Sequence, residues 1–122
     1  MFSLNDIGQI RLSRGDTLTL PIYINQGTSM DRIIYTLADN DELYFAIMEP
    51  NQPWEQAIVK KKYTCKDNTE DSGILLMINP EDTMCLLPGL YYYQIKVRVF
   101  DLDRNTYIVN SIIPKTQFWI EE

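Results

Sequence analysis

The feature that most constrains this chain is a two-residue alternation of apolar and polar side chains, clearest from Leu90 to Phe100. Successive side chains of a β-strand point to opposite faces, so this period gathers the apolar residues on one face. That face carries Tyr91, Tyr93, Ile95, Val97 and Val99. Tyr92 falls on the other face, among glutamine, lysine and arginine. The segment therefore predicts a long strand with one face in a core and the other in solvent.

Shorter segments repeat this pattern. From Thr17 to Ile24, leucine or isoleucine occupies every even position, and Pro21, which lacks a backbone donor, indicates a sheet edge or a bulge. Residues that favour strands predict further ones at 32–37, 42–48, 54–64, 73–79, 106–113 and 116–120. Asp39 to Asp41 is typical of a turn. Only residues 80–86 favour a short helical turn, because Pro80 suits a first helical position and acidic residues follow it.

The strand pattern sets the fold class. About eight short strands with short connections and no crossover helices predict an all-β domain, either a sandwich or a partly open barrel. An immunoglobulin-like antiparallel β-sandwich of about seven to nine strands fits the length of 122 residues best. The chain has no internal repeat, low-complexity tract or linker. We expect a single domain over residues 1–122.

Charge and cysteine usage exclude several classes of function. The net charge of −6 disfavours binding to nucleic acid and to anionic membrane surfaces, since both carry phosphate. No apolar run approaches the roughly 18 residues needed to span a bilayer. Cys65 and Cys85 lack metal-ligand spacing and are expected to be ordinary thiols in a reducing compartment. Residues Met1 to Asp6 show no features of a signal peptide, so we expect a cytoplasmic chain.

The inventory of catalytic groups is thin. The chain has no histidine, the commonest general base and transition-metal ligand, and no phosphate-binding glycine loop. Three acidic groups could in principle serve a small carboxylate hydrolase: Asp39 with Asp41 and Glu42, Glu81 with Asp82, and Asp101 with Asp103. All fall in predicted turns, where such residues bond their own backbone. We expect no enzymatic activity.

One segment resembles the start of a calcium loop. Asp101 to Asn105 has its D-x-D-x-N spacing, but Thr106 replaces the glycine and Ile112 replaces the twelfth-position acid. A hairpin turn explains the segment better. We expect no metal ion and no cofactor.

Aromatic residues are the best candidates for contacts with a partner. Trp54, Trp119 and Tyr92 could pack in a core, stack on sugar rings as in a carbohydrate-binding module, or anchor a protein contact. We prefer the protein contact and keep carbohydrate binding as the alternative.

The expected edge strands indicate which surface contacts a partner. Lys60 to Lys62 indicate an edge strand, because lysines on a sheet edge disfavour pairing with a further strand. The strand at 116–120 has no comparable lysines and is expected to be an exposed edge. Alternation there sends either Trp119 or the pair Phe118 and Ile120 inward. We expect Phe118 and Ile120 in the core, with Trp119 toward a partner.

Five short segments, taken in order, resemble a family of phage tail and baseplate proteins. They are Leu12–Thr17, Asp41–Ile47, Ile78–Thr83, Leu87–Tyr93 and Thr116–Glu122. Together they span about residues 10 to 122. The family domain that they resemble is the immunoglobulin-like N-terminal domain of upper baseplate proteins and of similar small prophage tail proteins.

The resemblance implies a structural part of a virion that carries or connects receptor-binding components, without an enzymatic site. Its expected partners are other tail or baseplate proteins, or further copies of itself. Such a protein would reside in the bacterial cytoplasm during assembly and then in the virion tail.

Overall fold

The chain folds into a mostly β structure, seen in a computed structural model that describes residues 2–4, 7–27, 33–101 and 103–122. The strands are β1 (Phe2–Leu4), β2 (Ile10–Ser13), β3 (Leu18–Ile22), β4 (Ile24–Gln26), β5 (Ile33–Tyr35), β6 (Glu42–Met48), β7 (Val59–Tyr63), β8 (Ile74–Ile78), β9 (Gly89–Asp101) and β10 (Thr106–Glu121). The helical elements are the 3₁₀ turns η1 (Trp54–Gln56) and η2 (Cys65–Asp67) and the short helix α1 (Pro80–Thr83). Within the described part of the chain, no helix has the length and apolar character that a membrane crossing requires.

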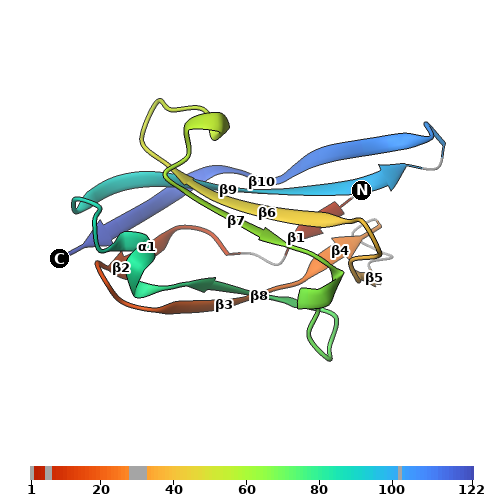
Figure 1. The fold of residues 1–122 in the computed structure, drawn as a ribbon, viewed down its shortest axis with the longest axis horizontal. Coiled ribbons are helices and arrows are strands. Elements are labelled where there is room, and N and C mark those ends of the chain that lie inside the picture. The colour runs from red at the N-terminus through yellow and green to blue at the C-terminus, as the bar shows by residue number, and fades with distance from the viewer. Residues whose placement is uncertain (1, 5–6, 28–32, 102) are drawn as a thin grey trace.

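The largest sheet has the strand order β2-β10-β9-β6-β7 and curls like part of a barrel. Its neighbours are antiparallel except β2 and β10, which run parallel in the register Phe118↔Ile10 to Glu121↔Ser13. The expectation of a purely antiparallel sheet is therefore wrong. The pair β3–β8 lies across the core from this sheet, and β1-β4-β5 forms a third small sheet (Figure 1).

The core lies on the face of the large sheet that the alternation predicted. Every second residue of β9 from Tyr91 to Val99 is buried, which confirms the prediction for the long strand. Tyr93 is fully buried at its centre, with ring centroids 5.8 Å from Phe45 on β6 and 6.3 Å from Phe118 on β10. Such tilted and edge-on ring pairs are favoured by the aromatic quadrupole. Three neighbouring strands are thus joined by one aromatic cluster.

The helix α1 begins where Pro80 was expected to start a helical turn, and it links the two layers. The Asp82 carboxylate accepts a hydrogen bond from the Asn79 backbone N–H at 2.7 Å. Its Oδ2 atom also lies 2.6 Å from Lys61 Nζ, and both side chains are mostly buried. The neighbouring Thr83 is buried and its hydroxyl accepts a bond from the Gly15 N–H at 2.9 Å.

Four predicted strands differ from the observed ones in where they begin or end. The strand expected at 54–64 begins only at β7, because Trp54–Gln56 forms η1 after Pro53. The strand expected from Thr17 to Ile24 is divided at Tyr23 into β3 and β4, which pair with different strands. The strands expected at 106–113 and 116–120 are one strand, β10, because two register shifts between Ser111 and Thr116 accommodate Pro114 as bulges do.

The structure confirms some of the predicted sheet edges and contradicts one. Strand β7 is an edge strand, as its lysines indicated, and β3, which contains Pro21, lies at the edge of its pair. The segment 116–120 is not an exposed edge, because β2 pairs with it from Phe118 onward. Phe118 and Ile120 nevertheless point into the core, as expected. Arg32 of the strand predicted at 32–37 lies outside the described residues, and β5 begins at Ile33.

Replacing the shared carboxylate should loosen the junction between the layers. Asp82→Ala removes the acceptor of the Asn79 N–H and leaves Lys61 mostly buried without its partner, so we expect the free energy of unfolding to fall by about 1–3 kcal/mol. Urea denaturation measures this loss. The matched control is Glu81→Ala, an exposed neighbour, which should change the free energy of unfolding by less than about 0.5 kcal/mol. Equal effects of the two variants would contradict the role assigned to Asp82.

Candidate interaction surface

The face of the large sheet that points away from the core, here called the outer face, collects all three predicted contact residues. Tyr92 lies on it because its neighbours Tyr91 and Tyr93 are buried, and Trp119 lies on it because Phe118 and Ile120 are buried. Trp54 reaches it from η1, since its ring stands over the side chain of Lys96, an outer-face residue of β9. The outer face is therefore an arrangement of residues far apart in sequence.

A loop covers part of the outer face and fixes the position of Trp54. Ala46 and Met48 of β6 point outward but are fully buried, and η1 contacts β6 there. Two lysines hold the loop by its carbonyl oxygens: Lys60 Nζ donates to Glu55 O at 3.4 Å and Lys115 Nζ donates to Gln52 O at 2.6 Å. In Figure 1 this loop rises on the side of the sheet opposite β3 and β8.

Three cation–aromatic pairs distinguish the outer face. Lys96 Nζ lies 4.4 Å from the centroid of the Trp54 ring. Arg98 Cζ lies 3.8 Å from the centroid of Tyr107, and Arg11 Cζ lies 5.1 Å from Trp119. A cation within about 6 Å of a ring centroid is attracted by the negative ring face. Each pair places a cation against a ring that is at least partly exposed to solvent.

Glu42 forms ion pairs with two of the basic side chains beside these rings. Its carboxylate pairs with Arg98 Nη1 at 3.0 Å and with Lys62 Nζ at 3.7 Å, and it accepts a hydrogen bond from the Tyr44 hydroxyl. The hydrogen bond from Tyr44 is the main cause that lowers the pKa of Glu42, and the two cations lower it further. Glu42 is therefore held ionised, whereas a general acid needs a raised pKa.

A second feature of the outer face was missed at the sequence level. The hairpin of β9 and β10 exposes Phe100, Tyr107 and Val109 side by side on this face. The Phe100 and Tyr107 rings pack edge to face with centroids 5.2 Å apart. The signal was present in the alternation from Leu90 to Phe100, which places Phe100 on the same face as Tyr92. Its partners on β10 could not be identified without the register of the hairpin.

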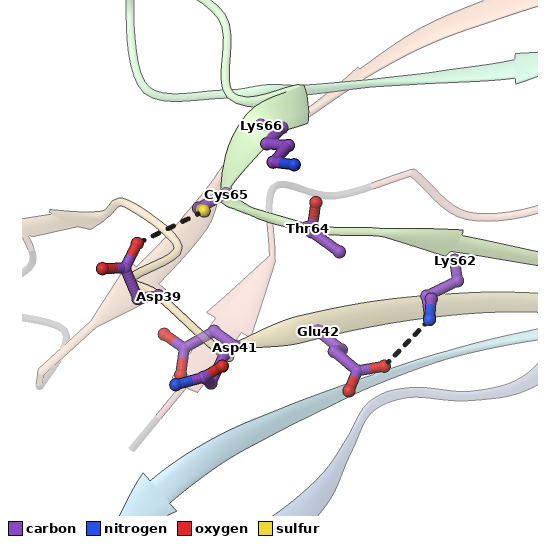
Figure 2. Close-up of a pocket in the computed structure, with 8 residues that line it drawn as sticks. Asp39, Asp41, Glu42, Lys62, Thr64, Cys65 and Lys66 are labelled. Carbon is purple, nitrogen blue, oxygen red and sulfur yellow. Dashed lines mark hydrogen bonds and ion pairs between the residues drawn. The ribbon is translucent and has the colours of Figure 1, made fainter.

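A depression of about 520 Å³ lies where β6 begins and β7 ends, and Figure 2 shows the side chains around it. It is lined by Asp39, Asn40, Asp41, Glu42, Lys62, Thr64, Cys65 and Lys66. The structure thus brings together the first acidic group proposed from the sequence. Asp41 is buried and accepts hydrogen bonds from the Ala38 N–H and the Tyr35 hydroxyl. Asp39 Oδ1 lies 3.6 Å from Cys65 Sγ. The Asp41 bonds stabilise a turn, in the way that short acidic side chains do.

The other acidic candidates lie elsewhere. Glu81 and Asp82 belong to α1, and Asp103 to Asn105 form the turn between β9 and β10. Leu102 of the loop with calcium-like spacing lies outside the described residues. Among the side chains that the structure describes, no group of three or more acidic or cysteine residues is placed to hold a metal ion. Cys65 and Cys85 are free thiols.

A scan against protein-family models gives no match, and a search of curated proteins gives none either.

The lowered pKa of Glu42 predicts a pH effect with a defined sign. A group whose pKa is lower in the folded chain stabilises the fold at neutral pH, and this stabilisation is lost as the pH falls below 4.5, its ordinary pKa, and through the lower pKa of the folded chain. Glu42→Gln should therefore unfold more easily at pH 7 and lose less stability on acidification than the wild type. Urea denaturation between about pH 7 and pH 3 measures both effects.

The control for this prediction is Glu55→Gln, an exposed residue of η1. It should keep the acid dependence of the wild type. If Glu42→Gln and the wild type lose stability in parallel as the pH falls, the ion pairs of Glu42 do not stabilise the fold.

Proposed function

We propose that this chain is a non-catalytic, immunoglobulin-like assembly module of a phage or prophage tail, which acts through protein contacts at its outer face. The observation that carries the proposal is the gathering of Trp54, Tyr92 and Trp119 on one sheet face, away from the core. Tryptophan and tyrosine are enriched at the energetically dominant positions of protein interfaces, and so is arginine.

Two structural features support the immunoglobulin-like assignment. The order β10-β9-β6-β7 matches the order G-F-C-C′ of a variable-type immunoglobulin sheet, with β3–β8 opposite. The Tyr91 hydroxyl, near the start of β9, donates a 2.7 Å hydrogen bond to the Leu87 carbonyl four residues upstream. Immunoglobulin domains contain such a tyrosine corner at the start of strand F. Both features agree with the domain type that the resemblance to baseplate proteins implies.

Carbohydrate binding is the alternative that uses the same tryptophans, and the geometry supports it less. Sugar stacking needs an open ring face, but Lys96 covers one face of Trp54 and Arg11 lies over Trp119. The exposed apolar side chains of Phe100 and Val109 also suit a protein surface better than a polar sugar. A carboxylate hydrolase is supported least, because Glu42 is held ionised by its donors.

The proposal includes a location and a kind of partner, which rest on the resemblance alone. The chain would be made in the bacterial cytoplasm and incorporated into the tail with other tail or baseplate proteins. Genes for a tape-measure protein, a holin or a lysin beside its own gene would support this role.

Removing the tryptophan most central to the proposal should weaken association without unfolding the chain. Trp119→Ala deletes a partly exposed ring from the outer face and leaves Phe118 and Ile120 in the core. We expect association with itself, or with the products of neighbouring tail genes, to weaken at least about 10-fold. Light scattering over a concentration series measures association, and thermal melting checks the fold.

A matched control comes from the opposite side of the molecule. Met77→Ala shortens a partly exposed apolar side chain of β8 and should leave association unchanged. If Trp119→Ala unfolds the protein, Trp119 is a packing residue and the outer face is not the working surface. Unchanged association of a folded Trp119→Ala variant also contradicts the proposal.

A further inference from the structure

The outer face is basic, although the chain as a whole has a net charge of −6. Its strands and the loop that covers it carry more cations than anions. The basic side chains are Arg11, Lys60, Lys62, Lys96, Arg98 and Lys115. The acidic ones are Glu42, Glu49, Glu55 and Glu121. The remainder of the molecule therefore carries the excess of negative charge.

These cations are held in place by contacts within the face. Arg11 pairs with Glu121 at 3.0 Å while it lies over Trp119, and Lys62 and Arg98 both pair with Glu42. Arg11 and Lys62 remain more than half exposed, at 57% and 58% of their side chains. Less side-chain conformational entropy is lost when a partner binds an ordered basic surface than when it binds a flexible one. The face is therefore prepared for an acidic partner.

A matching surface exists on the same chain. The segment 66–71 between β7 and β8, here called the acidic loop, exposes Asp67, Glu70 and Asp71 with only Lys66 to balance them. The loop is also ordered, because Asp71 Oδ2 accepts a 2.6 Å hydrogen bond from the Tyr23 hydroxyl and Asp67 Oδ2 accepts one from the Thr64 N–H at 2.8 Å. In Figure 1 it projects at the β8 side of the molecule, away from the loop over the outer face.

We propose that the outer face of one copy of this chain binds the acidic loop of a second copy. The contact is head-to-tail, because the two surfaces lie on different sides of each molecule, and repetition of such a contact gives a ring or a filament. A symmetric contact between two outer faces would instead bring together two surfaces that each carry six basic and four acidic side chains, and therefore the same net positive charge. Charge of the same sign on both sides disfavours that contact, whereas the acidic loop supplies the opposite sign. The inference rests on the proposed function, since it names the partner of that same face.

The test uses charge reversal on each surface. Glu70→Lys changes an exposed residue of the acidic loop, and Lys62→Glu changes an exposed residue of the outer face. Sedimentation velocity over a concentration series should show that the wild type associates and that each variant associates at least about 5-fold more weakly. A 1:1 mixture of the two variants should recover association, because each supplies the intact surface that the other lacks.

Two controls accompany these variants. Lys66→Gln makes the acidic loop more negative and should strengthen association. Raising the ionic strength from about 0.05 M to 0.5 M should weaken association of the wild type, since exposed charges are screened. Thermal melting of every variant checks that it is folded.

Each contrary outcome identifies which idea fails. If Glu70→Lys associates like the wild type while Lys62→Glu and Trp119→Ala do not, the acidic loop is not the partner, although the outer face still works. If the wild type stays monomeric but binds the product of a neighbouring tail gene through Trp119, the second copy is not the partner and the proposed function stands. If folded variants of both surfaces behave like the wild type, both ideas are wrong.

Discussion

Burial of one face of β9 is the constraint on which the rest of the structure depends. Tyr93 sits at its centre and contacts Phe45 on one neighbouring strand and Phe118 on the other. A one-residue slip of either neighbour would turn its apolar residues to solvent, so the register of the large sheet is fixed by this cluster. The Tyr93 hydroxyl also donates to the Gly8 carbonyl, which ties the segment before β2 to the same centre. The parallel pairing of β2 with β10 follows two residues later.

The same register decides what the opposite face displays. Because Tyr91, Tyr93 and Ile95 point inward, Tyr92 and Lys96 must point outward, in line with residues of β6 and β10. Pairing then places Arg98 between Glu42 on one strand and the ring of Tyr107 on the other. The cation–aromatic pairs of the outer face are therefore a consequence of core packing. A change in the core that shifted β9 would separate them.

The predictions from the sequence were most accurate where one local pattern was enough. Alternation identified β9 and the outward direction of Tyr92. It also separated Trp119 from Phe118 and Ile120, and the expectation that the latter two point inward is confirmed. The lysines of β7 correctly indicated a sheet edge, and Pro80 correctly indicated the short helix α1. Errors arose where a distant segment decides the outcome. The strand expected at 54–64 begins only at β7, because its first residues form a 3₁₀ turn that packs on β6. The edge expected at 116–120 is covered by β2, which is more than 100 residues away in the chain.

The sequence by itself therefore determined the β class of the fold and the division of the long strand into a core face and an outer face, with Tyr92 on the outer one. The tertiary structure alone decided which residues meet. Trp54, Tyr92 and Trp119 share a surface, Lys96 and Arg11 lie over two of their rings, and Phe100 and Tyr107 pair on the hairpin. The physical reason is that the direction of a side chain depends on local backbone geometry, which a period of two reveals. Proximity depends instead on strand order and register, which the packing of the whole core selects.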